Sequence, residues 1–344
     1  MKALVVSHRH HLLPVAWRLQ QEGWEIDLIV DRDSYERAWK GKFDPKLRKI
    51  DKRSRQTMKA QVRLAEEGGY AVLTDSPKWN SEFGEYPNLF GFVPRPEGAN
   101  KLPNIMLGGW FDGEEFTARH LLVEDQGLWP GGMGPDVPGG LTLIAPISWP
   151  EAFEVALGRV KDELKARGYR GLVKVGITLR TDPEAGSLEP ELIGYQAGWN
   201  FLQTHAVLAE AGDFGTPRLT EILQGATPTF HHRYTVAIPV SIPPYPNRAA
   251  TAEAADRRLI PIEAVKCGHI YWHDMLIEDG VMQTAGLDGL VGVVRASANS
   301  LMLARTQALG FARLINLPQL QVRLDVSSEV DRVLAMLEGS GVPI

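Results

Sequence analysis

The sequence has very little cysteine, no long apolar run and no large excess of charge. Cys267 is the only cysteine among 344 residues, which excludes an intrachain disulfide and a cysteine-rich zinc module and is typical of a reducing compartment. The sequence has no run of about 18 or more apolar residues, which is the length needed to span a bilayer. Its N-terminus has the pattern of a strand rather than that of a signal peptide. The net charge of -5 gives no global reason to expect nucleic acid. These absences predict a soluble, cytoplasmic protein with no membrane partner.

Several common catalytic motifs are also missing. The sequence has no G-x-S-x-G nucleophile elbow, no Walker lysine loop and no H-E-x-x-H zinc motif. A dinucleotide-binding fold would place a glycine-rich turn after the first strand, but residues 7–11 are Ser-His-Arg-His-His. The sequence therefore gives no support to serine hydrolase, P-loop or Rossmann cofactor chemistry.

Apolar strands and a helical pattern alternate over the first 75 residues, within a chain long enough for two or three domains. This β-α-β opening is typical of a doubly wound sheet, whose carboxyl strand ends form the usual ligand edge. His8 and Arg9 follow the first strand, so they are candidates for binding an anionic substrate, and plain polar loop residues are the alternative. The predicted strands cover residues 2–6, 24–30 and 70–75, and the predicted helix covers residues 12–21.

A basic stretch follows. Residues 40–63 hold ten lysines and arginines against two aspartates, and they predict a helix with a solvated basic face. The alternative is a patch for phosphate or nucleic acid, but only Phe43 could supply an aromatic ring for base stacking. Residues 76–104 are rich in proline, glycine and asparagine, which is typical of an irregular linker.

The most informative segment joins an acidic hairpin to a glycine-rich loop. Residues 109–116 are Gly-Trp-Phe-Asp-Gly-Glu-Glu-Phe and predict two strands around a turn, and residues 130–135 are Pro-Gly-Gly-Met-Gly-Pro. Carboxylates beside bare backbone N–H groups suit a phosphate or a hard metal ion. Glycine clusters by themselves are more often turns, and the acidic hairpin is what strengthens the signal.

These two motifs resemble the centre of the glycinamide ribonucleotide synthetase (phosphoribosylamine–glycine ligase) family of ATP-grasp ligases, in which an acidic hairpin precedes a GGMG substrate loop. Later segments resemble family segments in the family's order, in the manner of divergent phage-type members. Each motif is loose, and their order carries the resemblance. The later segments are residues 169–179, 189–198, 236–246 and 268–325. Within the last segment, the sequence predicts a turn at Asp279–Gly280, a strand over 285–294 and an amphipathic helix over 300–314.

The resemblance implies an α/β (α+β), ATP-grasp-like fold in which the small ATP-grasp subdomain is reduced or missing. Lys78 and Lys101 are the only lysines between Asp75 and Trp110, and the resemblance makes them candidates for holding ATP. The implied parts are a Rossmann-like pre-ATP-grasp domain (1–75), an irregular linker in place of the small subdomain (76–104), an ATP-grasp-like central domain (105–247) and a C-terminal ligase-type domain (248–344).

The resemblance also implies an activity, the ATP-dependent joining of glycine to the amine of phosphoribosylamine through an acyl phosphate, in purine biosynthesis or nucleotide modification. Mg²⁺ bridges phosphates through oxygen ligands, so Glu115 and Glu191 are the candidate metal ligands. Arg180 and Arg295 are candidate catalytic groups that would neutralise phosphate charge. The candidate substrate loop, for glycine or another nucleotide-like amine, consists of Gly131, Gly132, Met133 and Gly134.

Two departures from the family pattern motivate an alternative. Ile193 stands where the family motif EFNARFG has its asparagine, and an apolar side chain cannot ligate magnesium. Gly108 and Gly109 stand where paired glutamates face the nucleotide. The alternative is a catalytically degenerate homologue that serves as a nucleotide-binding or protein-interaction module. A third hypothesis, a ligase acting on a modified nucleotide or DNA base, has only the basic stretch as a hint.

A histidine-containing segment allows one further metal hypothesis. His269 and His273 would lie on one face of a strand, with Cys267 in phase and Asp274 adjacent, and Zn²⁺ accepts those atom types. The resemblance puts no metal there, so a structural strand is the preferred interpretation.

Overall fold

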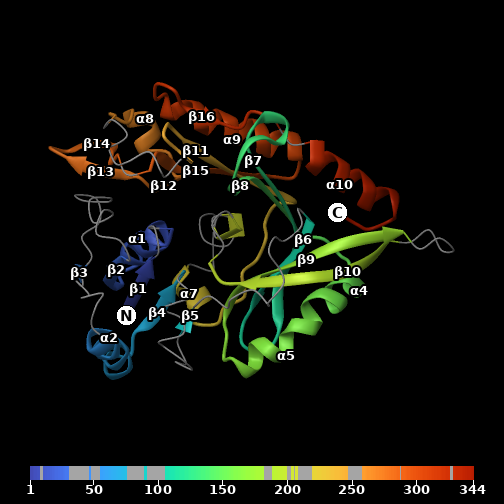
Figure 1. The fold of residues 1–344 in the computed structure, drawn as a ribbon, viewed down its shortest axis with the longest axis horizontal. Coiled ribbons are helices and arrows are strands. Elements are labelled where there is room, and N and C mark those ends of the chain that lie inside the picture. The colour runs from blue at the N-terminus through green and yellow to red at the C-terminus, as the bar shows by residue number, and fades with distance from the viewer. Residues whose placement is uncertain are drawn as a thin grey trace.

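Two β-sheets organise the computed structural model (Figure 1). The predictions for His8, Arg9, Lys78 and Lys101, and for most of the basic stretch, lie outside the residues that the structure describes. The described residues are 1–7, 11–30, 46–47, 55–75, 89–90, 105–181, 188–199, 203–204, 206–207, 219–246, 258–286, 288–325 and 328–344.

The N-terminal sheet is parallel and has the strand order β3-β2-β1-β4-β5. The central strand β1 is buried along almost its whole length, because helices cover a parallel sheet on its faces. The predicted strands and the first predicted helix are confirmed. The elements are β1 (Lys2–Ser7), α1 (Leu13–Gln21), β2 (Glu25–Val30), β3 (Lys46–Leu47), α2 (Arg55–Gly68), β4 (Ala71–Thr74) and β5 (Leu89–Phe90).

The prediction of one helix over the basic stretch is wrong in its first part. β3 lies inside the stretch and pairs in parallel with β2, and α2 covers Arg55–Gly68. Pro45 explains the difference, because proline removes a helical hydrogen bond and disfavours helical backbone at the residue before it. β5 lies within the predicted linker and extends the sheet beside β4.

The larger sheet has nine strands among the described residues, in the order β10-β9-β6-β7-β8-β11-β15-β12, with β16 paired to β11. It runs without a break from the central segment into the C-terminal segment, because β8 pairs with β11 and β11 pairs with β15. Its strands are β6 (Ile105–Phe111), β7 (Phe116–Trp129), β8 (Met133–Ala145), β9 (Gly171–Thr181), β10 (Leu188–Ala197), β11 (Tyr234–Ser241), β12 (Ile270–Trp272), β15 (Leu290–Ala298) and β16 (Gln321–Val322).

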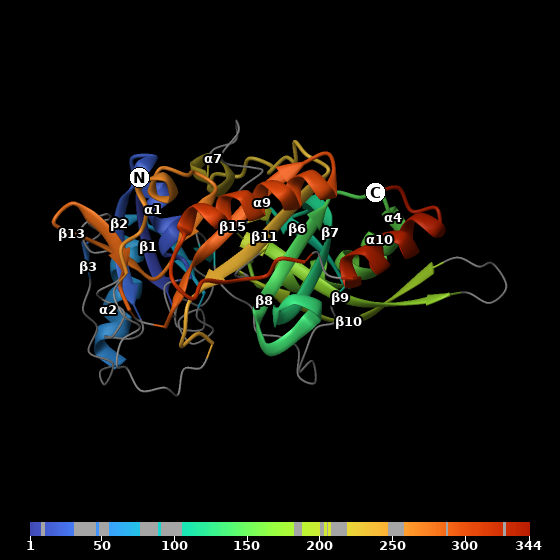
Figure 2. The same cartoon turned by 90° about the horizontal axis from the view of Figure 1, so that it is seen from above.

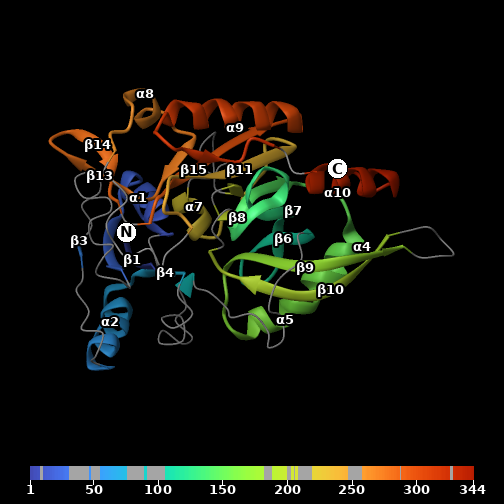
Figure 3. The same cartoon turned by 45° about the horizontal axis from the view of Figure 1, so that its top comes forward.

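Helix α9 lies along β15 and β11 (Figures 2 and 3). Three buried alanines, Ala304, Ala308 and Ala312, recur every four residues and let the helix approach the sheet closely. The helix predicted over 300–314 is confirmed. The remaining elements are η2 (Pro130–Gly132), α4 (Pro150–Phe153), the π-helical η3 (Glu154–Gly158), α5 (Arg159–Ala166), α7 (Leu219–Leu223), α8 (Ile262–Val265), α9 (Leu301–Ile315), α10 (Ser328–Gly339) and the hairpin of β13 (Met275–Glu278) and β14 (Val281–Thr284).

The strand predicted over 285–294 begins later, at Leu290. Gly286 and Gly289 have φ angles of 73° and 81°, which a strand does not accommodate. The turn predicted at Asp279–Gly280 is confirmed between β13 and β14. Within the described part of the chain, no helix has both the length and the apolar character needed to cross a membrane.

Candidate functional site

The two faces of the large sheet differ in chemistry. A Cβ atom added to Gly109 would lie 3.3 Å from Leu157 Cδ1 of η3. The face of the sheet to which Gly109 points is therefore the one that η3 and α5 cover. A Cβ atom added to Gly108 would point the opposite way and clash with His120 Nε2. Strand register places Lys174 and His120 on either side of Gly108, so both belong to this second face. We call it the polar face and define it by His120, Glu124, Thr142, Lys174, Thr178 and Glu191.

A buried ion pair lies on the polar face. Lys174 Nζ on β9 is 2.8 Å and 3.0 Å from the two carboxylate oxygens of Glu124 on β7, and both residues are less than 10% exposed. Thr142 is the register partner of Glu124, and among the described residues its buried Oγ1 has no hydrogen-bond partner. Removing two charges from water costs several kcal/mol per ion, so such a pair contributes little net stability. The pair is therefore a candidate for a functional role.

His120 is held as a neutral imidazole. Its Nδ1 lies 2.7 Å from the Ala118 carbonyl oxygen, and its Nε2 lies 3.2 Å from Gln203 Nε2. An amide nitrogen can only donate, so Nε2 accepts and the proton sits on Nδ1. Complete burial lowers the pKa of His120 to about 4, and its ring packs edge-on against Phe230. His120 is thus a neutral, fully buried ring, held at both nitrogens, on the same face of the sheet as the ion pair.

Burial of His120 predicts a pH-dependent stability. The folded pKa is about 4 and the ordinary pKa is 6.5, so the unfolded chain binds more protons between these values. The contribution of neutral His120 to the free energy of unfolding should be fully present above about pH 6.5. It should fall by about 2–3 kcal/mol on acidification to about pH 4.5. Urea unfolding at both pH values measures it. His120→Gln should reduce this loss relative to wild type, whereas exposed His231→Gln should leave it unchanged; an equal loss in all three proteins would contradict the assignment.

Gly108 makes room for His120. In Gly108→Ala the new methyl group would meet His120 Nε2 and lie 2.8 Å from Gln203 Nε2, both of which are fixed by hydrogen bonds. We expect the free energy of unfolding to fall by about 1–3 kcal/mol, the usual effect of overpacking. Thermal or urea unfolding measures it.

The matched control is Gly310→Ala, in the interior of α9, where nothing lies within 4 Å of the new Cβ atom. Alanine favours helix over glycine there by about 0.5–1 kcal/mol. The same glycine-to-alanine change should therefore lower the free energy of unfolding at position 108 and raise it at position 310. A Gly108→Ala variant with unchanged stability would show that His120 is not fixed.

The predicted residues Arg180 and Glu191 are brought together at the exposed end of β9 and β10. Arg180 Nη2 lies 2.7 Å from Glu191 Oε2, and the Thr178 hydroxyl donates to the same oxygen at 3.4 Å. Arg295 lies elsewhere: it is buried on β15, its guanidinium is 4.6 Å from the centre of the Tyr271 ring, and it donates to the Gly268 carbonyl. The two predicted arginines therefore occupy different environments.

Glu115 lies at the turn of the acidic hairpin, where the Asp112 carboxylate accepts from the N–H groups of Glu114 and Glu115 at 2.8 Å. Its carboxylate pairs with Lys161 of α5, the helix on the opposite face of the sheet from Glu191. The structure therefore does not bring the two predicted metal ligands together. No group of three metal-ligating side chains occurs among the residues described, including those around Cys267.

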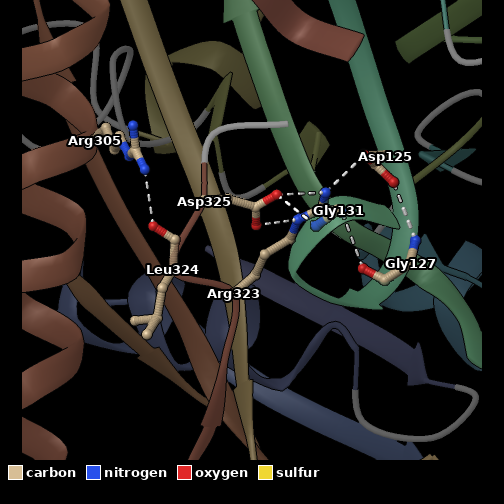
Figure 4. Close-up of polar contacts among 7 residues, drawn as sticks. All are labelled: Asp125, Gly127, Gly131, Arg305, Arg323, Leu324 and Asp325. Carbon is tan, nitrogen blue, oxygen red and sulfur yellow. Dashed lines mark hydrogen bonds and ion pairs between the residues drawn. The ribbon is translucent and has the colours of Figure 1, made fainter. Parts of the chain in front are cut away.

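The glycine loop forms the tip of the β7–β8 hairpin. Gly131, Gly132 and Gly134 have φ angles of 73°, 69° and 83°, which glycine adopts without strain. Gly131 N–H donates to Asp325 at 2.7 Å, so the C-terminal segment fixes the loop (Figure 4). Met133 is 64% exposed beside it. The predicted substrate loop is thus a turn that a hydrogen bond ties to the C-terminal segment, with the apolar side chain of Met133 exposed.

Arg323 anchors this arrangement. Its guanidinium is 1% exposed, lies 2.9 Å from Asp125 and 2.8 Å from Asp325, and donates to the Gly127 carbonyl at 3.1 Å (Figure 4). Burial opposes ionisation of Asp325, but hydrogen bonds from Arg323 and Gly131 outweigh it and hold its pKa below the ordinary value. We call Asp125, Gly127, Gly131, Arg323 and Asp325 the clasp.

The sequence patterns did not predict the buried pair, His120 or the clasp. One signal was present, because Lys174 interrupts the apolar run Leu-Val-Lys-Val and a charge inside a buried strand needs a partner. His120 and Glu124 are four residues apart, which puts both on one face of a strand. For the clasp no local pattern exists, since Arg323 and Asp125 are far apart in the chain.

Comparison with known proteins gives a fold but no close relative. No protein family matches the sequence, and no curated protein sequence matches it. Among solved structures, phosphoribosylamine–glycine ligase from Thermotoga maritima has a TM-score of 0.54 at 13% identity, covering 95% of this chain and 100% of that one. The fold is ATP-grasp-like.

Two larger enzymes share this ATP-grasp-like fold. Urea carboxylase from Kluyveromyces lactis has a TM-score of 0.53 at 11% identity, covering 99% of this chain and 32% of that one. Pyruvate carboxylase from Rhizobium etli has a TM-score of 0.50 at 11% identity, covering 98% of this chain and 41% of that one. This chain therefore corresponds to about a third of the former enzyme and two fifths of the latter.

Proposed function

We propose that this protein is an ATP-dependent carboxylate–amine ligase whose reaction takes place on the polar face. The buried Lys174–Glu124 pair carries the proposal, because it places a fixed cation at the centre of an ATP-grasp-like sheet, on the same face as the buried Thr142 hydroxyl opposite Glu124. The similarity in fold to a phosphoribosylamine–glycine ligase over that enzyme's whole length supports the same class of reaction. Glycine and phosphoribosylamine, as in purine biosynthesis, are the proposed substrates.

The proposed reaction has two steps. A carboxylate oxygen attacks the terminal phosphorus of ATP, forming an acyl phosphate and releasing ADP. The amine nitrogen then attacks the acyl carbon, the new C–N bond forms, phosphate leaves and the amine loses a proton. Lys174 would neutralise phosphate charge and Thr142 would donate a hydrogen bond, both from fixed positions, so little reorganisation accompanies the reaction.

Several of the residues predicted from sequence keep their proposed roles. Glu191 is a hard oxygen ligand on the polar face, and Mg²⁺ is commonly held by one or two carboxylates together with substrate phosphates, whose charge it offsets. Glu115 does not fit that set, because it pairs with α5 on the other face. Arg180 is a proposed cation for phosphate, Gly131–Gly134 are proposed to bind the amine substrate, and His8, Arg9, Lys78 and Lys101 are proposed to bind substrate and ATP. Arg295 does not fit this centre, because it is buried on β15 against Tyr271.

Measurement of ADP release tests the proposal. With Mg²⁺, ATP, glycine and phosphoribosylamine, the protein should release ADP only when both substrates are present. Lys174→Met should abolish release, whereas Lys165→Met, at an exposed lysine of α5, should retain it. If neither this pair nor a panel of other carboxylates and amines produces ADP, the ligase proposal fails.

A specific observation favours a second candidate, a catalytically degenerate ATP-grasp homologue that binds a nucleotide. Arg180 already pairs with the Glu191 carboxylate, and exposed Ile193 follows two positions later where an oxygen ligand would be needed. Calorimetric titration separates the two proposals. Binding of ATP without ADP release supports the degenerate homologue, whereas ADP release excludes it.

A further inference from the structure

A pocket of about 420 Å³ lies between α1 of the N-terminal sheet and the segment from α8 to β12. None of the residues that define the polar face lines it. Its volume is within the range of small-molecule sites. Because its walls come from segments about 250 residues apart, a ligand bound there would contact both the N-terminal and the C-terminal parts of the chain. The residues that determine its chemistry are Trp17, Arg18, Lys266, Cys267, His269 and Tyr271.

The lining combines aromatic rings with cations. The described residues that line it include no carboxylate, and Lys266 is exposed and makes no ion pair with any of them. Arg18 supplies a guanidinium group, whose Nε forms an ion pair with the Glu22 carboxylate at 2.9 Å and so adds hydrogen-bond donors rather than net charge. Glu22 in turn accepts from the N–H groups of Leu219 and Thr220 at the start of α7, so Arg18 is held in place. Lys266 therefore gives the lining its net positive charge, which favours an anionic ligand.

The aromatic wall is preformed. The guanidinium of Arg295 lies 4.6 Å from the centre of the Tyr271 ring, and His269 stacks on Phe311 with ring centres 4.3 Å apart and planes at 6°. Burial lowers the pKa of His269, so this ring stays neutral and adds no charge. A wall fixed in this way needs little reordering when a flat ring binds beside it.

We propose that this pocket binds a compact aromatic anion, a ring bearing a carboxylate or phosphate group. The ring packs against Trp17 and Tyr271, and the anionic group meets Lys266 with Arg18 nearby. Both parts of the ligand contribute to binding. Its ring buries apolar surface against the aromatic side chains, and its anionic group is oriented by the cation. The pocket is thus a second ligand site that does not depend on ligase activity.

Cys267 provides a built-in reporter, because it lines the pocket and is the only thiol in the chain. Burial raises its pKa, so alkylation by iodoacetamide is best followed at about pH 8.5, where more thiolate forms. The probes are phenyl phosphate and benzoate, with benzylamine as a ring of opposite charge and inorganic phosphate as an anion without a ring. Mass spectrometry of the intact protein gives the rate.

Only unliganded protein reacts, so phenyl phosphate at ten times its Kd should slow alkylation about tenfold. Benzoate should slow it as well, whereas benzylamine and inorganic phosphate at the same concentrations should change the rate less than twofold. Equal protection by all four probes, or protection by none, would overturn the proposal. If the thiol does not react even without a probe, calorimetric titration with the same four compounds decides between the same outcomes.

Charge reversal of Lys266 is the decisive variant. Lys266→Glu should raise the concentration of phenyl phosphate needed for half-protection about tenfold, with no change in melting temperature, because the side chain is exposed. Lys165→Glu makes the same change at an exposed lysine of α5 outside the pocket and should leave protection as in wild type. Unchanged protection in Lys266→Glu, or an equal loss in both variants, would show that the ligand binds elsewhere.

Discussion

Replacing Arg323 with alanine should lower the free energy of unfolding by about 3–5 kcal/mol, the usual result of removing one partner from a buried ion pair. Arg323 is 1% exposed and lies within 3 Å of both Asp125 and Asp325. Its loss would leave two carboxylates and the Gly127 carbonyl without their shared donor. Urea unfolding followed by tryptophan fluorescence measures the change.

Arg305→Ala is the matched control. Arg305 donates to the Leu324 carbonyl at 3.0 Å, next to the clasp, but does so at the surface (Figure 4). Loss of one such hydrogen bond should cost only about 0.5–1.5 kcal/mol. If the two variants lose equal stability, the clasp does not hold the β7–β8 hairpin to the C-terminal segment.

The clasp also bears on function, because Asp325 accepts a hydrogen bond from Gly131 N–H. Arg323→Ala should weaken this contact and make the glycine loop more mobile even in the folded protein. Under the proposed function, the KM for the amine substrate should rise more than kcat falls, since the loop binds substrate. Arg305→Ala should change neither parameter.

Sequence patterns predicted the elements well where local signals dominate. The first strand follows from a short continuous apolar run, the acidic hairpin from two strand-like segments around a turn, and α9 from the helical spacing of its apolar residues, and the structure confirms all three. Errors occurred where a single residue overrides the pattern. Pro45 interrupts the basic stretch, and Gly289 delays the start of β15 until Leu290.

The candidate site was harder to predict because its contacts are long-range. Lys174 and Glu124 are 50 residues apart, and the register of three strands brings them together. Gly108 is an instructive case: the family comparison interprets it as a lost glutamate, whereas the structure shows that it makes room for a buried histidine. Comparison with a motif shows that a residue type is absent at a position. It does not show which side chain occupies the space beside that position.

The buried pair on the polar face yields the largest expected effect on activity. Lys174→Met would leave Glu124 buried without its partner and should lower the free energy of unfolding by about 3–5 kcal/mol. The double variant Lys174→Met/Glu124→Leu removes both charges, and such replacements are often neutral or stabilising by about 1–4 kcal/mol. Urea unfolding should therefore show that the double variant recovers the stability lost by the single variant.

Activity should not recover with stability. The double variant keeps a folded sheet but lacks the cation proposed to neutralise phosphate, so ADP release should remain absent in the ligase assay. The exposed pair Arg63 and Glu67 on α2, changed together to Met and Leu, is the control and should leave ADP release unchanged. A double variant that is stable and still releases ADP would place the reaction away from Lys174. A stable but inactive one would show that the buried pair serves the reaction, because its stability would exclude unfolding as the cause of the lost activity.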